Sequence, residues 1–123
     1  MNTDPSPNGK MSEMISDMAA DFIGLGDTPE EKQNRLTAAC SAWNMACSSP
    51  ETRQRQLEQY IESLRNFNPA NTPSNLANIR EELEMLIERK LQMFPEDQRQ
   101  IVSAKVIMVG TDCRIKVGST TLR

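Results

Sequence analysis

The spacing of apolar residues changes once along the chain, at Pro95, and this change constrains the fold more than any other feature. Before Pro95, apolar residues recur every three or four positions, the period of helices that bury one face. Beyond it, residues 101–109 are rich in valine and isoleucine, and residues 113–121 alternate in a manner typical of β-strands. The pattern predicts an α+β, mainly α fold: a four-helix N-terminal body followed by a C-terminal β-hairpin.

Local start and stop signals divide the helical part into four segments. Thr28-Pro29, Ser49-Pro50 and Thr72-Pro73 each place a hydroxyl side chain before a proline, a combination that caps and opens helices. We expect helices at residues 11–24, 29–47, 50–67 and 73–94, strands at 100–109 and 113–121, and a three-residue turn, Gly110 to Asp112, between the strands.

The chain of 123 residues is expected to form one domain, residues 11–123, after a flexible leader, residues 1–10. The leader contains two prolines and one glycine and has no apolar run. Trp43 is the only tryptophan and shares its helical stripe with small side chains, so it is predicted to anchor the core.

The chain contains no histidine, which removes the commonest general base and neutral metal ligand. The three cysteines, Cys40, Cys47 and Cys113, lack the spacing of a metal site or a disulfide framework and are expected to be reduced, buried side chains. We therefore expect a protein that is not an enzyme and holds no cofactor or metal. The cysteines and the absence of a long apolar segment favour a cytoplasmic location with no membrane association.

The first predicted strand has apolar side chains on both of its faces. An isolated two-stranded ribbon is marginally stable, and a strand that is apolar on both sides usually has something packed on both. The face that carries Ile101, Ile107 and Val109, called here the second face, is predicted to meet the helices or a second copy of the chain. In the latter case two chains form a homodimer joined through their hairpins. The first face comprises Val102, Ala104, Val106 and Met108, and the second comprises Ile101 and the partner-binding candidates Ile107 and Val109.

A methionine-rich stripe on the first predicted helix is the other candidate partner surface. Flexible, polarisable thioether side chains suit adaptable recognition, although a stripe of this spacing also serves as ordinary core packing. Glycines at the end of the helix would allow it to swing outward. The stripe consists of Met11, Met14, Met18 and Phe22.

Charge is unevenly distributed along the sequence. Five cations and one anion give residues 99–123 a side-chain charge of +4, so the first 98 residues carry −7. A basic hairpin can contact phosphate groups, although the ribbon has no aromatic side chain on which a base could stack. The nucleic-acid candidates are Lys105, Arg114, Lys116 and Arg123.

Taken together, the sequence predicts a small protein-interaction protein, such as an adaptor, accessory or chaperone-like factor. Its partner would be a protein, bound through the helical body and the apolar hairpin surface. A nucleic-acid-binding regulator that uses the basic hairpin is the alternative.

Overall fold

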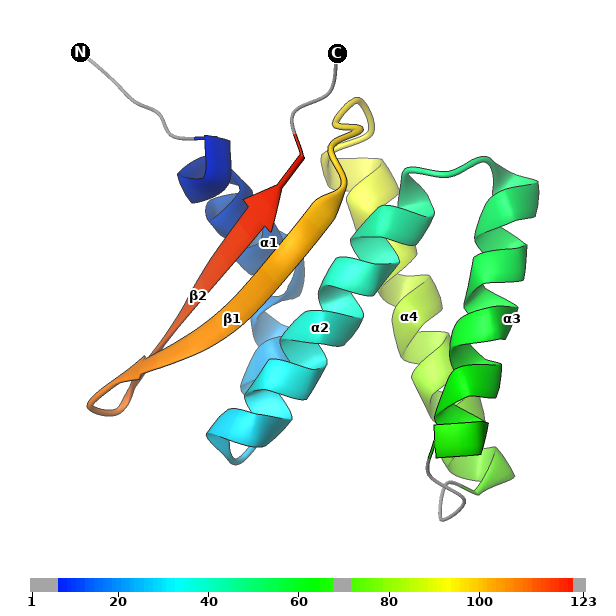
Figure 1. Cartoon of the computed structure of the whole chain (residues 1–123), viewed down its shortest axis with the longest axis horizontal. Helices are drawn as coiled ribbons and strands as arrows, with labels where there is room; N and C mark the ends of the chain where they lie inside the picture. The colour runs from blue at the N-terminus through cyan, green and yellow to red at the C-terminus, as the bar shows by residue number, and fades with distance from the viewer. Residues whose placement is uncertain (1–6, 68–71, 121–123) are drawn as a thin grey trace.

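The computed structural model describes residues 7–67 and 72–120, with side chains from Met11 onward. Four helices precede a two-stranded antiparallel hairpin (Figure 1). This arrangement confirms the mainly helical α+β fold. The elements are α1 (Pro7–Gly24), α2 (Pro29–Ala46), α3 (Pro50–Phe67), α4 (Pro73–Met93), β1 (Ile101–Val109) and β2 (Asp112–Ser119).

The helix starts follow the local signals in the sequence. The Thr28 hydroxyl accepts a hydrogen bond from the Glu31 amide, and the Thr72 hydroxyl accepts one from the Asn75 amide, both at 3.1 Å. Helix α1 begins at Pro7 and therefore includes residues 7–10, which belong to the predicted leader. The remainder of the predicted leader, residues 1–6, lies outside the described residues.

Helix α2 lies between the hairpin and α4, and its tryptophan is the centre of the core (Figure 1). Trp43 is fully buried, and its indole N–H donates to the Arg99 carbonyl at 2.8 Å. The Phe94 ring lies 5.7 Å away, centroid to centroid. The prediction of a core anchor at Trp43 is confirmed, and the indole also fixes the chain just before β1.

Lys90 is the one charged side chain buried in the described core. Its ammonium group donates to the Asp97 carbonyl at 2.5 Å and lies 5.0 Å from the centroid of the Trp43 ring. A buried cation needs such partners because leaving water is costly. These contacts hold the end of α4 against the segment that leads into the hairpin.

The hairpin closes through a two-residue turn rather than the expected three-residue one. Val109 pairs with Asp112, so Gly110 and Thr111 alone form the turn and Asp112 is the first residue of β2. Gly110 has a φ of 65°, a conformation that costs glycine little and other residues considerably more.

A β-bulge at the start of β1 changes which side chains face the helices. The register shifts between Ile101 and Ser103, which leaves Val102 without a partner on β2. As a result Ile101 is 8% exposed and Val102 is 66% exposed. The prediction of which face each side chain occupies is therefore wrong for Ile101 and Val102. From Ala104 to Val109 the predicted faces agree with the register.

Two amide side chains of α2 attach β1 to the helical body. Asn44 donates to the Ile101 carbonyl at 3.0 Å and accepts from the Ile101 amide at 2.7 Å. Gln33 donates to the Ala104 carbonyl at 3.0 Å and accepts from the Val106 amide at 2.7 Å. Each amide therefore bonds to β1 as a neighbouring strand would.

In the described part of the chain, no helix combines the length and the apolar character needed to cross a lipid bilayer.

Candidate interaction surface on the hairpin

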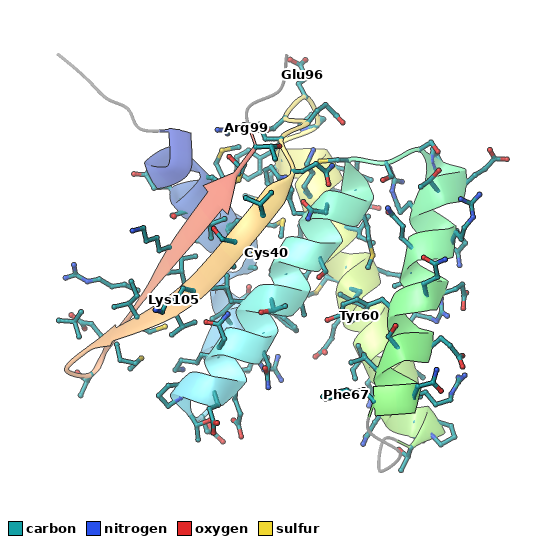
Figure 2. All side chains as sticks on the ribbon, in the orientation of Figure 1. Cys40, Tyr60, Phe67, Glu96, Arg99 and Lys105 are labelled. Atoms are coloured by element: carbon teal, nitrogen blue, oxygen red, sulfur yellow. The ribbon has the colours of Figure 1, made fainter. Side chains whose placement is uncertain are left out.

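The side of the hairpin turned away from the helices is called here the outer face. The strand register alternates side chains between this face and the core, because successive residues of a strand point to opposite sides. Lys105 lies opposite Lys116, and Ile107 lies opposite Arg114. Figure 2 shows Lys105 about midway along the hairpin. The outer face comprises Val102, Lys105, Ile107, Val109, Asp112, Arg114 and Lys116.

The three cations of the outer face have no ionic or hydrogen-bonding partner within the described residues. Most other described cations are engaged: Arg80 pairs with Glu58, Arg89 pairs with Asp21, and others donate to backbone carbonyls. Among side chains that the structure describes, the exceptions are Arg55 on α3 and the hairpin set of Lys105, Arg114 and Lys116.

The pairing of Lys105 with Lys116 places two like charges directly across the ladder. Side chains at such positions have Cβ atoms about 4.5–5.5 Å apart, where like charges repel and weaken the hairpin. Asp112 is the one anion of the outer face, and it lies opposite Val109 instead of either lysine. The outer face thus carries a local electrostatic cost that a bound anionic group would relieve.

Apolar side chains lie among these cations. Val102 is 66% exposed, Val109 51% and Ile107 39%. The sequence singled out Ile107 and Val109 as candidates, and the structure places both at the surface near the closed end of the hairpin, which extends away from the helices (Figure 1). Exposed apolar groups mixed with unpaired charges are typical of a surface that contacts another protein.

The other apolar candidates lie inside the molecule. Met11 and Met18 are fully buried, and Met14 and Phe22 are 8% and 6% exposed. Residues that pack into the core in this way are not available to a partner while α1 remains in place. The ordinary packing that such spacing also indicates is what the structure shows.

The basic residues of the chain's end separate into two groups. Arg99 is engaged by the Asp97 carboxylate at 2.6 Å, and this hydrogen bond lowers the pKa of Asp97 below its ordinary value. Lys105, Arg114 and Lys116 share the outer face. Arg123, the fourth nucleic-acid candidate, lies outside the described residues.

A groove between the helices was missed by the sequence reasoning. It has a volume of about 520 Å³ and lies between α2, α3 and α4. Leu25 and Phe67 at its rim are 64% and 89% exposed, and Tyr60 is on the side of α3 that faces α2 (Figure 2). The only signal in the sequence is that Leu25 stands between two glycines and that Phe67 directly precedes Asn68-Pro69, a pair that favours the end of a helix.

The cysteines occupy three different environments. Burial raises the pKa of Cys40 to about 12, and burial also raises the pKa of Cys47. The Cys47 thiol lies 3.7 Å from the carbonyl oxygens of Asp97 and Arg99, to which it donates. Cys113 is exposed, so the expectation of burial is wrong for this residue. Within the described residues, no cluster of three or more Cys, Asp or Glu side chains could hold a metal ion.

Comparison with known proteins finds no matching family model, no matching curated protein and no matching solved structure. The function is therefore inferred from the chemistry of the outer face.

Proposed function

We propose that this protein is a protein-interaction module that binds an acidic, partly apolar segment of another protein through the outer face of its hairpin. One observation carries this proposal: unpaired Lys105, Arg114 and Lys116 share a face with exposed Ile107 and Val109. Carboxylates of the partner would neutralise the cations, and its apolar side chains would cover the exposed aliphatic groups.

A second copy of the chain is a less suitable occupant of this face. In a homodimer built by packing two outer faces together, the three cations of one copy would meet the three of the other. Such a juxtaposition of like charges opposes association. We therefore propose a different protein as the partner, and a homodimer becomes one outcome of the test.

Nucleic acid is the second candidate because the unpaired cations could contact phosphates. The two ligands differ in what they require of the apolar residues: binding through phosphates depends on the cations and on salt, whereas binding of a protein segment also depends on Ile107 and Val109. The three free cysteines support a reducing, cytosolic setting for either activity.

The test uses a fluorescein-labelled heptapeptide of alternating residues, Val-Glu-Val-Glu-Val-Glu-Val, called here the acidic probe, and a short DNA duplex. Binding to the full chain is followed by fluorescence anisotropy. Lys116→Glu is expected to weaken binding of the acidic probe about fivefold or more. Arg55→Glu is the matched control, since it makes the same change of charge at an unpaired cation on α3.

The outcomes separate the candidates. Binding of the acidic probe that Lys116→Glu weakens and Arg55→Glu does not, with no binding of the duplex, supports the protein partner. Tight binding of the duplex supports nucleic acid instead, if its affinity falls steeply with added salt and is unchanged in Ile107→Asn. Equal effects of Lys116→Glu and Arg55→Glu would contradict both, and a doubled mass in light scattering that is lost in Ile107→Asn would restore the homodimer.

A further inference from the structure

The free edge of β2 differs from the edge of β1 in the number of backbone groups that are covered. In an antiparallel hairpin, residues of alternate pairs direct their N–H and C=O groups away from the partner strand. The bonds from Gln33 to Ala104 and Val106, and from Ser12 to Val117, identify these outward-pointing residues. By the register they are Ala104, Val106 and Met108 on β1, and Cys113, Ile115 and Val117 on β2.

The edge of β1 is largely closed by α2. The Gln33 side chain hydrogen-bonds to the Ala104 carbonyl and the Val106 amide. The Asn44 side chain hydrogen-bonds to the amide and the carbonyl of Ile101, beyond the bulge. Covering an edge in this way prevents another strand from pairing with it.

The edge of β2 is covered only at its end. The Ser12 hydroxyl accepts a hydrogen bond from the Val117 amide at 2.9 Å. Among the residues that the structure describes, none bonds to the outward N–H or C=O groups of Cys113 and Ile115. Cys113 is exposed and Ile115 is half-buried. Two consecutive outward-pointing residues are thus open to an incoming strand.

The open edge borders a depression with its own charge pattern. The depression has a volume of about 480 Å³ and lies between β2 and α1. Glu13 and Asp17 of α1 lie on its helix side, and no cation pairs with either within the described residues. Arg114 lines its other side, and Lys116 lies next to Arg114 along the outer face. A strand placed here would therefore meet cations on one face and carboxylates on the other.

We infer that the partner segment adds to the edge of β2 as a third, antiparallel strand, paired with Cys113 and Ile115. This inference rests on the proposed function and specifies how the acidic segment binds. Side chains of the added strand alternate between its two faces. Acidic residues therefore contact Arg114 and Lys116, and the intervening residues face α1, where a lysine or arginine is favoured by Glu13 and Asp17. Ile107 and Val109, on the outer face of β1, are left to apolar residues of the partner outside this strand.

The geometry fixes which backbone amides of the acidic probe are needed. In the antiparallel pairing, the residues directly opposite Cys113 and Ile115 direct their amides toward β2, and their side chains face α1. These are the valine positions of the probe, while the amides of its glutamates face solvent. Methyl groups on the internal valine amides should weaken binding about tenfold, and the same number on the glutamate amides should leave it nearly unchanged.

Protein variants test the same contact from the other side. Cys113→Pro removes an outward amide without removing a bond to β1, since that amide points away from the ladder. It should weaken binding about fivefold, whereas the matched control Cys113→Ser keeps the amide and should bind like the parent. Amide spectra of both variants establish that the hairpin remains folded, and the methylated probes require no change to the protein.

The side-chain register is tested with a probe in which one internal valine is replaced by lysine. This probe should bind about threefold more tightly than the original, and the gain should be lost in Asp17→Asn. A gain that survives in Asp17→Asn would contradict the placement beside α1.

The results distinguish a failure of strand addition from a failure of the proposed function. If both methylated probes bind equally well while Lys116→Glu still weakens binding, strand addition is wrong and the proposed function stands. If the unmethylated acidic probe does not bind at all, the proposed function itself is wrong.

Discussion

Replacing Asn44 with alanine should loosen the attachment of the hairpin to the helical body. The change removes both hydrogen bonds to Ile101, at 2.7 and 3.0 Å, and leaves the amide and carbonyl of a residue that is only 8% exposed without partners. At about 1–1.5 kcal/mol for each bond, the free energy of unfolding should fall by about 2–3 kcal/mol. Alanine is the better helix former by roughly 0.5 kcal/mol, which offsets a small part of this loss.

Asn34→Ala is the matched control, because Asn34 lies on the same helix, is exposed, and makes no side-chain hydrogen bond to any residue that the structure describes. Urea unfolding followed by circular dichroism measures both variants. With a slope of roughly 2 kcal/mol per molar urea, the midpoint of Asn44→Ala should lie about 1–1.5 M below that of the control. Hydrogen exchange at the Ile101 amide should accelerate in the same variant. Midpoints that agree within about 0.3 M would refute the view that this amide anchors β1.

Three further variants test the electrostatics and the turn. Lys116→Glu places an anion opposite Lys105, so it should raise the free energy of unfolding, measured in urea, by about 0.5 kcal/mol. The same variant weakens binding of the acidic probe. A loss of stability would show that the two lysines do not repel each other. Because Arg99 holds the pKa of Asp97 below its ordinary value, Asp97 stabilises the fold at neutral pH, and this contribution is lost as pH falls through the lowered pKa. Urea unfolding between neutral pH and about pH 3 should therefore show parent and Asp97→Asn converging in acid, and a constant gap would contradict this assignment. Gly110→Ala forces a side chain into a φ of 65° and should lower the melting temperature by the equivalent of about 1 kcal/mol, with no change in melting as the contrary result.

The helices were predictable because their signals are local. The Thr28 and Thr72 caps form with amides three residues away, so the residues that decide a helix start are all within one turn of it. The hairpin turn was less predictable, since Gly110 fits loops of two or three residues equally well. The bulge at Val102 left no mark on the sequence, because valine and isoleucine suit either face of a strand.

The candidate surface was predictable only in part. The exposure of Ile107 and Val109 followed from a strand that is apolar on both sides. The methionine stripe has the same spacing whether it faces a core or a partner, and only the packing of α1 against the rest of the chain distinguishes the two. The open edge of β2 could not be foreseen, since it depends on where α1 meets β2. Ser12 of α1 covers the outward amide of Val117 and leaves those of Cys113 and Ile115 open.

The amino-acid order alone determined the four helices, the change to strands after Pro95 and the burial of Trp43, because periodicity and capping act over a few neighbouring residues. The tertiary structure alone decided that Lys90 is buried beside Trp43, and that Lys105, Arg114 and Lys116 are left together on one face. The environment of a charge is set by groups that the fold brings from distant parts of the chain, and no local pattern in the sequence records which groups those are.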